Sequence, residues 1–530
     1  MKRWNGWGNI RTDYPLPASA RDYLIAFFGP LDPRPDADFE SVLRSVPPAR
    51  LPAHPLVDAS PEARLTHARG QSLPDWVALR SGRIPAFPDG VAFPQNEADV
   101  RGLLTWARQT GAAVIPYGGG TSVVGHINPP AGPAPALTLS LERMTRLLDL
   151  DEVGQTALFE AGVTGPALEA ALAQRGYTLG HFPQSHEYST LGGWIAARSS
   201  GQQSYHYGRI EQLFLGGHVE TPRGPLHLLP LPASAAGPEV REMVLGSEGR
   251  LGVITQARVR ISRLPEAEEF YGVFFPTWEQ GREAVRQMAQ ERLPVSMMRL
   301  SNPQETETTL ILSGKAWVPA AVRGLALMGY GVERSLLVFG VTGSAAHVRR
   351  TRAQAAAICR KHGGLFVGTP VGHTWRKSRF LAPYLRNTLW EAGVAVDTLE
   401  TLIPWARVGE ASQAIPAAIV AAMEKFNERV LAFAHLSHIY REAASIYTTF
   451  LFRRTEDPDE LLERWRAMKH AASLTIQQFG GTITHQHGIG SDHAPYLPAE
   501  KGPLGMEAIR AVCQVFDPDG MMNPGKLFVR

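Results

Sequence analysis

A run of apolar residues ends in three consecutive glycines in the stretch AAVIPYGGGTSVVGH, residues 112–126. The apolar part predicts a buried strand, and the glycines predict a turn whose bare N–H groups can face an anion. Two familiar phosphate-binding motifs do not fit. A dinucleotide-binding fold needs G-x-G-x-x-G before a helix, and a P-loop needs Gly-Lys-Ser/Thr. A tight loop without any ligand explains the three glycines equally well.

Three more loops rich in glycine or hydroxyl residues occur in the same region. They are PQSHEYSTLGGWIAARSSG at 183–201, YGRIEQL at 207–213 and GSEGRLGVIT at 246–255. One such loop can be a plain turn, but four of them indicate a long polar ligand that contacts several loops. A dinucleotide has about this length, and its pyrophosphate would explain the first glycine loop.

The size and charge of the chain limit its class. With 530 residues it exceeds a single small core, so two or three domains are expected. The net charge is only +3 and the basic residues are scattered, which argues against a nucleic-acid-binding surface. Two cysteines, Cys359 and Cys513, are too few for a disulfide framework or a cysteine-rich zinc site, and we expect both to be buried.

No targeting signal is visible in the sequence. The first residues, MKRWNGWGNIRTDYPLP, lack the apolar core of a signal peptide, and no stretch approaches the length of a membrane span. The last residues, KLFVR, differ from the tripeptide that the peroxisomal receptor binds. We therefore expect a cytoplasmic protein.

The order of predicted elements divides the chain into four parts. Residues 1–85 predict an arm wrapped on a larger body, and residues 86–265 alternate strands and helices as an α/β domain does. Residues 266–479 predict an α+β layer with a mostly antiparallel sheet, and residues 480–530 predict a turn-rich segment that folds back on the first domain. The predicted helices are 20–28, 97–110, 166–175, 278–291, 346–362 and 458–479; the predicted strands are 112–117, 136–141, 156–161, 213–219, 252–261, 270–275, 335–340, 430–434 and 445–452.

The order and text of these stretches resemble the FAD-binding domain of the vanillyl-alcohol oxidase/p-cresol methylhydroxylase superfamily. Within it, the chain is most similar to the alkyldihydroxyacetonephosphate synthase (alkylglycerone-phosphate synthase) family, whose members make the ether bond of ether lipids. The resemblance implies an α+β fold, with a two-subdomain FAD-binding α/β domain and a substrate (cap) domain that has a mostly antiparallel sheet. The motifs that carry it are RWNGWG, HARGQSLPDWVALRSG, PYGGGTSV, EYSTLGGW, YGRIEQL, GSEGRLGVIT, SMMRLSN, PYLRN, ETLIPW, SIY and GGTITHQHGIG.

The resemblance also implies which residues bind FAD. The pyrophosphate would lie on Gly118, Gly119, Gly120, Thr121, Ser122, Val123 and Val124. The rest of FAD would contact Gln184, Ser185, His186, Glu187, Tyr188, Ser189, Thr190, Ala197, Arg198, Ser199, Ser200, Glu248, Gly249, Arg250, Leu251, Gly252, Val253 and Ile254. The family has an aspartate at the position of Gln184. No histidine stands where relatives with covalent flavin carry one, so we expect FAD to be bound non-covalently.

Four histidines stand in two short runs, His435-Leu-Ser-His438 and His485-Gln486-His487. Their spacing fits either a metal site or polar residues satisfied on a buried strand. The 2-hydroxy-acid dehydrogenases of the superfamily bind a divalent metal here, with the motifs His-x-Gly-Asp-Gly-Asn-x-His and Glu-His-Gly. This chain lacks the first motif and has a neutral amide, Gln486, in place of the glutamate. We therefore predict that no metal is bound.

The synthase family implies a catalytic set at the same place. Tyr447 in SIY matches the family's catalytic tyrosine, and His485 and His487 match the outer residues of its His-His-His stretch. Arg299 in SMMRLSN and Arg386 in PYLRN match two arginines that the family needs. We assign Tyr447 as proton donor and acceptor, supported by the two histidines, and Arg386 as the residue that binds the anion. Arg299 would hold the site in shape.

The family's reaction exchanges the acyl group of acyl-dihydroxyacetone phosphate for a fatty alcohol without net redox, with the flavin as a covalent handle. A tyrosine can transfer the proton only if cationic or donor groups lower its pKa or stabilise the developing charge. The lipid substrates imply peripheral membrane contact, and the family implies a homodimer. The alternative function is an FAD-linked dehydrogenase or oxidase of a 2-hydroxy acid or related alcohol, and a third is a non-catalytic flavoprotein.

Overall fold

The glycine-rich loops lie at the ends of strands from two sheets. The computed structural model describes residues 2–12, 14–312, 314–315 and 318–529. The first sheet has the order β1-β2-β4-β3, in which β2, β4 and β3 are parallel, and the second is the antiparallel sheet β5-β6-β10-β8-β9. A short pair joins β7 to β11. The strands are β1 Val57–Asp58, β2 Gly90–Ala92, β3 Ala113–Tyr117, β4 Ala136–Ser140, β5 Leu147–Asp151, β6 Thr156–Glu160, β7 Tyr177–Thr178, β8 Phe214–Thr221, β9 Gly224–Leu228, β10 Val253–Arg260 and β11 Ser262–Arg263.

Local signals in the sequence set the helices of this part. In α5, Asn96 accepts a hydrogen bond from the Asp99 N–H at the start, and Gly111 ends the helix with a left-handed backbone. Its apolar face, at 100, 103, 104 and 107, is buried against the sheets. The helices are α1 Ala18–Phe28, α2 Phe39–Arg44, α3 Pro61–Thr66, α4 Leu73–Ser81, α5 Glu97–Thr110, α6 Gly165–Ala173, α7 Leu191–Ala197, α8 Ser204–Tyr207, α9 Ile210–Leu213 and α10 Arg241–Val244.

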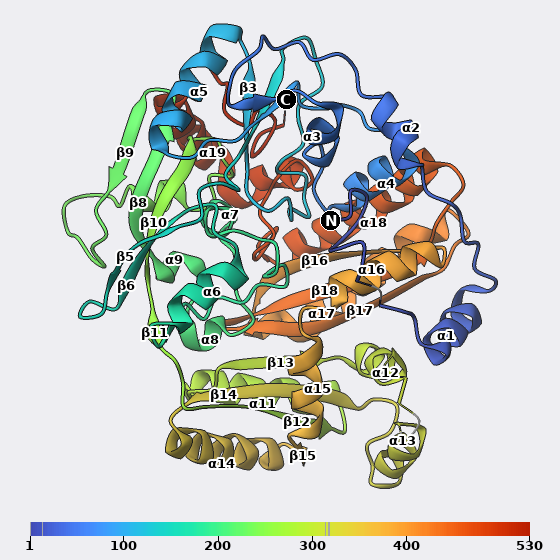
Figure 1. The fold of residues 1–530 in the computed structure, drawn as a ribbon. Coiled ribbons are helices and arrows are strands. Elements are labelled where there is room, and N and C mark those ends of the chain that lie inside the picture. The colour runs from blue at the N-terminus through green and yellow to red at the C-terminus, as the bar shows by residue number, and fades with distance from the viewer. Residues whose placement is uncertain (1, 13, 313, 316–317, 530) are drawn as a thin grey trace.

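The remainder of the chain is built on one seven-stranded antiparallel sheet, β15-β12-β14-β13-β17-β18-β16. Figure 1 shows that β12 to β15 lie in a lower lobe, whereas β16 to β18 pass under the glycine-loop part. The sheet therefore joins the two halves of the molecule. The strands are β12 Ala267–Phe275, β13 Met297–Ser301, β14 Ser335–Gly343, β15 Leu365–Gly368, β16 Val394–Pro404, β17 Val430–Ile439 and β18 Ala443–Arg453.

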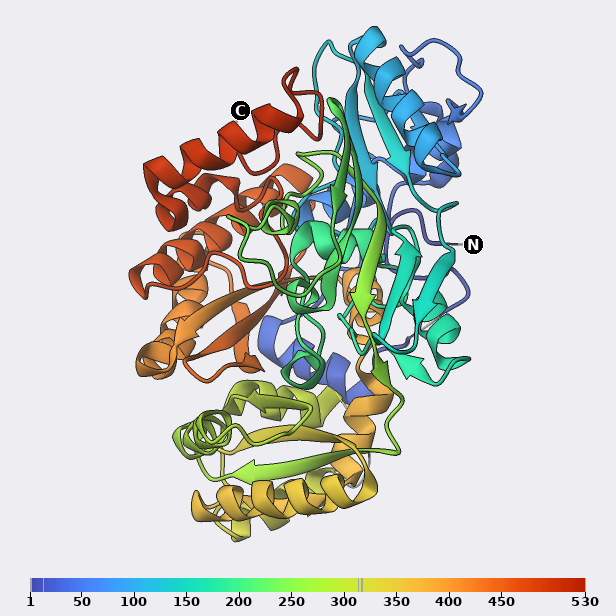
Figure 2. The same ribbon diagram turned by 90° about the vertical axis from the view of Figure 1, so that its left-hand side faces the viewer.

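Helices cover this sheet in two groups. In the lower lobe α11 and α14 pack on β12 and β14, as the view in Figure 2 also shows, and in the upper half α17 packs on β16, β17 and β18 and against α18. The last long helix, α19, continues from the short 3-10 turn at Ala494–Tyr496. The helices are α11 Trp278–Gln290, α12 Pro303–Leu312, α13 Val318–Leu327, α14 Ala345–Lys361, α15 Pro370–Ser378, α16 Ala382–Glu391, α17 Trp405–Glu424, α18 Pro458–Gln478 and α19 Leu497–Phe516.

The predicted fold class is confirmed, because a mixed domain with glycine-rich loops is followed by a domain on an antiparallel sheet. Each predicted helix and strand overlaps an observed one. The prediction of a turn-rich C-terminal segment is wrong at α19, whose charged and apolar residues form a 20-residue helix kinked at Gly502. The segment after it returns to the first sheet, where Val114 bridges Met522.

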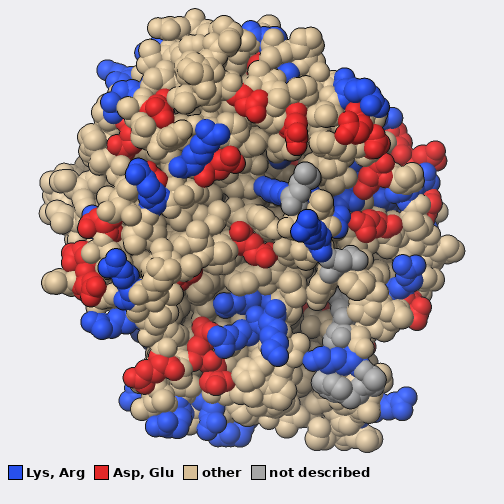
Figure 3. All heavy atoms as spheres, in the orientation of Figure 1, with Lys and Arg blue, Asp and Glu red and all other residues tan. Residues whose placement is uncertain are grey.

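The surface carries both signs of charge. Figure 3 shows Lys and Arg interspersed with Asp and Glu, and a group of basic side chains in the lower centre, where α15 lies. The last turn of α15 contributes Arg376 and Lys377. Both cysteines are buried and free, as predicted. Across the described ranges, no helix combines the length and the hydropathy that a membrane span requires.

Candidate functional site

A cavity of about 790 Å³ extends from the glycine-rich loops to the polar face of the seven-stranded sheet. Its volume is at the upper end of the range for small-molecule sites. Tyr447, His487, Arg299 and Arg386 all line it, whereas His485 lies behind its wall. The predicted cofactor residues that line it are Gly118, Gly119, Gly120, Thr121, Ser122, Val123, Gln184, Ser185, Ser189, Thr190, Ala197, Ser199, Ser200, Glu248, Gly249, Gly252, Val253 and Ile254.

Seven predicted cofactor residues do not line the cavity but support its walls. His186 stacks between Trp194 and Phe380, and Arg198 forms an ion pair with Glu242. The others are Val124, Glu187, Tyr188, Arg250 and Leu251; of these, Arg250 donates to the Met522 carbonyl and Leu251 is in the core.

The need for glycine at residues 118–120 comes from neighbouring protein groups. A Cβ at Gly119 would lie 1.7 Å from the Tyr188 carbonyl oxygen, and one at Gly118 would lie 2.3 Å from Thr190 Oγ1. A Cβ at Gly120, whose φ is +72°, would meet the Tyr117 hydroxyl at 2.2 Å. The expectation that an anion accounts for these glycines is therefore incomplete. Contact with Thr190 and Tyr188 of the second loop already requires glycine at 118 and 119, and Tyr117 with the positive φ requires it at 120.

The same loop nevertheless fits a pyrophosphate. The backbone N–H groups of Gly118 to Val123 donate to no acceptor within the described part of the chain, although these residues line the cavity. Unpaired N–H groups in consecutive positions form an anion-binding concavity. The donor set and the length of the cavity thus fit a dinucleotide cofactor.

One row of the sheet carries the polar side chains of the opposite wall. Glu400 on β16 pairs with Tyr447 on β18, which pairs in turn with His435 on β17. Directly paired residues in antiparallel strands point to the same face. Ser445 and Ser437 continue the polar surface, because their hydroxyls lie 3.2 Å apart and both bond to Glu400. The strand register therefore assembles a site from residues that are far apart in the sequence.

Tyr447 is held between two imidazoles. Its ring stacks on His435 with centroids 4.9 Å apart and meets the His487 ring edge-on at 5.8 Å. Burial raises the pKa of the Tyr447 phenol, and the neighbouring Arg299 opposes this shift without cancelling it. The phenol pKa is therefore not lowered in the protein without ligands, which leaves the second condition, that neighbouring groups stabilise the charge that develops during the reaction. The phenol is protonated at neutral pH and is available as a proton donor.

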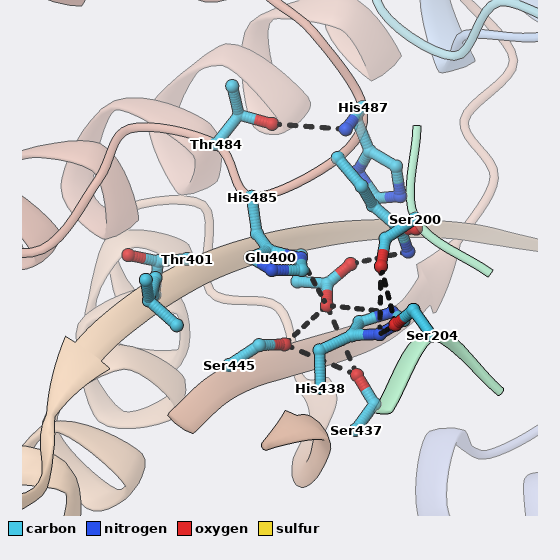
Figure 4. A network of polar contacts seen from close by, with 12 residues as sticks. Ser200, Ser204, Glu400, Thr401, Ser437, His438, Ser445, Thr484, His485 and His487 are labelled. Carbon is cyan, nitrogen blue, oxygen red and sulfur yellow. Dashed lines mark hydrogen bonds and ion pairs between the residues drawn. The ribbon is translucent and has the colours of Figure 1, made fainter. Parts of the chain in front are cut away.

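Glu400 is the centre of a buried polar network (Figure 4). Its carboxylate accepts hydrogen bonds from Ser445, from Ser437 at 3.1 Å and from the Gln486 amide at 2.7 Å. Burial acts to raise the pKa of Glu400, but the imidazoles of His438 and His485 outweigh it and hold the pKa well below its usual value. Glu400 is therefore an ionised anchor that fixes the Gln486 segment against the sheet.

Among the residues described, three members of the network are close enough together to hold a metal ion. They are Glu400, His438 and His485, whose ligand atoms lie within 4.8 Å of one another. The His485 Nε2 atom accepts from Arg209 at 3.0 Å and from the Tyr440 hydroxyl at 2.7 Å. Its proton is therefore on Nδ1, which lies 3.3 Å from Glu400. The charge of Arg209 beside the His485 ring disfavours a divalent cation, so the geometry favours a proton on His485 Nδ1 over a metal ion at this place. That no metal is bound stays a prediction.

The two predicted arginines have different surroundings. Arg299 is paired with Glu305 at 2.8 Å and also donates to Ser301, which suits a residue that keeps the site in shape. Arg386 stacks over Trp76 at 4.3 Å and donates from Nη1 to the Gln71 carbonyl. Its Nε and Nη2 atoms are buried and have no hydrogen-bond partner among the residues described. Burial lowers the pKa of Arg386 to about 10, so it stays charged.

The polarity of the cavity changes along the same three strands. Phe433 lies in the row of Thr398 and Thr449, and the lining face continues with Val396 and Leu451; all three of these further residues are apolar. Leu385 and Leu389 of α16 add to this end. A site that is polar at one end and apolar at the other suits an amphiphilic ligand.

Several lining residues were not selected from the sequence. Trp7, Gln71 and Trp76 come from the N-terminal part, and Glu400 stands behind the wall. All four lie within motifs that carry the family resemblance, RWNGWG, HARGQSLPDWVALRSG and ETLIPW. The motifs indicated that these stretches matter, but no chemical pattern indicated which residue would face the cavity.

Comparisons with known proteins agree with this geometry. The model of an FAD binding domain matches residues 88–229, and that of the C-terminal domain of FAD linked oxidases matches residues 264–527. Alkyldihydroxyacetonephosphate synthase of Trypanosoma brucei brucei is 30% identical and aligns over 99% of this chain and 92% of its own. The Dictyostelium discoideum enzyme of the same name is also 30% identical, and the alignment covers 88% of this chain and 77% of that enzyme. A solved alkyldihydroxyacetonephosphate synthase structure has a TM-score of 0.84 and 27% identity, covering 99% of both chains.

Proposed function

Because this chain belongs to the alkyldihydroxyacetonephosphate synthase family, we propose that it makes alkyl-dihydroxyacetone phosphate from acyl-dihydroxyacetone phosphate and a fatty alcohol. It is a flavin-dependent transferase, and FAD is its cofactor. The observation that carries the proposal is one continuous cavity with three regions: unpaired loop N–H groups, a polar row around Tyr447 and an apolar end.

These regions fit the parts of the proposed substrate. The apolar end at Val396, Phe433 and Leu451 would accept the acyl and alkyl chains. Arg386 has two buried donors without a partner in the described chain and would bind an oxyanion, since a planar guanidinium can form two parallel hydrogen bonds to one. The reacting carbon would then lie near Tyr447, between the anion site and the apolar end.

The residues of the polar row would divide the proton chemistry. Tyr447, protonated in the free enzyme, would donate to the departing carboxylate and later take the proton from the incoming alcohol. His487 and His435 hold its ring, and Arg299 lies close enough to oppose the rise in the phenol pKa. When bound, FAD supplies a ring that can hold the substrate carbon covalently between the two half-reactions.

The test is anaerobic mixing of the yellow protein with palmitoyl-dihydroxyacetone phosphate and hexadecanol. Release of palmitate and formation of the alkyl product, with the flavin oxidised at the end of turnover, would support the proposal. Lasting bleaching of the flavin by a 2-hydroxy acid, without acyl exchange, would replace it with the dehydrogenase function.

Three finer properties are proposed beyond the reaction itself. We expect FAD to leave the polypeptide on mild denaturation, and a flavin retained on a denaturing gel would contradict this. We expect a homodimer by light scattering and no stoichiometric divalent ion by metal analysis. We also expect a cytoplasmic enzyme. Its lipid substrates support peripheral membrane contact, which co-sedimentation with phospholipid vesicles would test.

A further inference from the structure

The RWNGWG segment is fastened over the cavity by specific contacts. Asn387 on α16 accepts from the Trp7 N–H at 3.1 Å and donates to the Trp7 carbonyl at 2.9 Å. Lys2 donates to the Gly119 carbonyl at 2.8 Å, on the first glycine loop. The segment thus connects the glycine loop to the helix that carries Arg386, and Figure 1 shows the start of the chain near α16 and α4.

Close packing leaves this segment little freedom. A Cβ at Gly6 would lie 2.5 Å from Asn387 Oδ1, and one at Gly8, whose φ is +85°, would lie 2.2 Å from the Tyr384 ring. The Trp7 ring meets Tyr188 edge-on at 5.4 Å, and only 5% of Trp7 is exposed. The segment is therefore a fixed part of the cavity wall, in which the backbone approaches α16 too closely for side chains.

Trp7 brings an unused donor to this wall. Its indole Nε1 is buried without a hydrogen-bond partner anywhere in the described ranges, although the residue lines the cavity. Arg386 presents two further donors of this kind. Gln71 connects the Trp7 segment to Arg386. Its side-chain amide donates to the Gly6 carbonyl at 3.3 Å, and its backbone carbonyl accepts from Arg386 at 2.5 Å.

Three buried donors without acceptors are costly unless a ligand pairs them. Arg386 forms no ion pair with a carboxylate among the described residues, although Asp397 and Asp75 are near enough to raise its pKa, so we expect the missing partner to be an anion. Gln71 also donates its backbone N–H to the Ser122 carbonyl at 2.6 Å, which places this group of donors beside the first glycine loop.

We propose that Trp7 is a ligand-binding residue whose indole N–H, together with Arg386, binds a phosphate oxyanion. One candidate for the ligand that carries this oxyanion is the phosphate of dihydroxyacetone phosphate esters, and this candidate rests on the proposed function. The other source of the same chemistry is the pyrophosphate of FAD, because the glycine loop is adjacent.

The experiment compares Trp7→Phe with Trp4→Phe in the full-length flavoprotein. Trp7→Phe keeps an aromatic ring against Tyr188 and both backbone bonds to Asn387, and removes only the donor. Trp4 lies in the same segment, packs against Phe39 with ring centroids 5.5 Å apart and does not line the cavity, so it is the matched control. Three quantities are measured: the FAD dissociation constant, the affinity for dihydroxyacetone phosphate by flavin spectral change, and KM for palmitoyl-dihydroxyacetone phosphate.

A hydrogen bond to a charged group predicts about a tenfold or larger loss of affinity in Trp7→Phe and none in Trp4→Phe. A loss for both phosphorylated ligands with unchanged FAD affinity identifies the substrate phosphate, and a loss for FAD identifies the pyrophosphate. Affinities equal to those of Trp4→Phe overturn the proposal. If the wild-type protein does not exchange acyl groups, the proposed function fails, whereas the two binding measurements still decide the role of Trp7.

Discussion

At the scale of single residues, the surroundings of Tyr447 determine where its ring lies and whether its phenol is protonated. The stacked His435 and the edge-on His487 fix the ring and thereby the position of its hydroxyl. Burial keeps the phenol protonated, which suits donation to a leaving group and makes the reverse step depend on the charges that arise during the reaction.

Tyr447→Phe should therefore keep the fold, FAD content and substrate affinity, because only one hydroxyl is lost. Turnover should fall by about a hundredfold or more, the usual effect of removing a positioned acid or base. Steady-state kinetics with flavin absorbance measure both properties. Tyr330→Phe in the lower lobe is the control, since its hydroxyl bonds to the Gly363 carbonyl outside the cavity. Full activity of Tyr447→Phe would remove it from the mechanism, and loss of flavin would make it a packing residue.

Arg386→Lys should behave differently, because lysine keeps a charge but loses the planar fork and the stacking on Trp76. We expect KM for acyl-dihydroxyacetone phosphate to rise about tenfold or more together with a fall in kcat. Arg454→Lys is a matched control. It is a similarly buried guanidinium that stacks over Trp390 at 4.2 Å and does not line the cavity. An unchanged KM in Arg386→Lys would exclude Arg386 from the anion site.

At the scale of elements, the first glycine loop and the loop at 188–190 form one unit. Their backbones approach so closely that a methyl group at Gly119 would overlap the Tyr188 carbonyl. The contact aligns the N–H groups of the first loop toward the cavity, so that loop packing and anion binding depend on each other.

Gly119→Ala should therefore separate the two loops and weaken FAD binding strongly while the secondary structure is retained. Flavin content after purification and the FAD dissociation constant measure the effect. Gly102→Ala on α5 is the control, because a Cβ there has open space and alanine favours a helix. Normal FAD affinity in Gly119→Ala would show that the loop can shift without loss of the site.

At the scale of the whole molecule, burial of neutral histidines couples stability to pH. Burial lowers the pKa of His181 to about 3, of His186 to about 4 and of His438 to about 3. Below pH 6.5 the unfolded chain binds protons at these positions and the folded chain does not. The free energy of unfolding therefore has its full value above this pH and falls as the pH decreases.

Between pH 7 and pH 5, each of these histidines should remove about 2 kcal/mol from the free energy of unfolding. Urea unfolding at the two pH values measures the sum. His181→Gln should reduce this difference in the free energy of unfolding by the contribution of one histidine, because glutamine does not titrate and can still reach Ser199, the hydrogen-bond partner of His181. A free energy of unfolding that is equal at both pH values would contradict the assignment of neutral buried imidazoles.

The sequence by itself determined the family and part of the secondary structure. Caps such as Asn96 and Gly111, the apolar face of α5 and the alternating strands are local signals, so the corresponding helices and strands were predicted within a few residues. The glycine loops predicted a dinucleotide, and the later motifs identified Tyr447 and His487 but not Glu400. Helix α19 was missed because its glycines and prolines resemble loop composition, while contacts with its neighbours stabilise it. Helix α17 and strand β16 were not predicted either.

Only the tertiary structure decided which residues meet in the cavity. The register of β16, β18 and β17 places Glu400, Tyr447 and His435 in one row, and a shift of one residue would turn each to the other face. Burial, which no local pattern contains, decided that the Tyr447 phenol stays protonated and that the donors of Trp7 and Arg386 lack partners. Long-range packing thus set the electrostatics of the site, because the local dielectric depends on neighbours that are distant in the sequence.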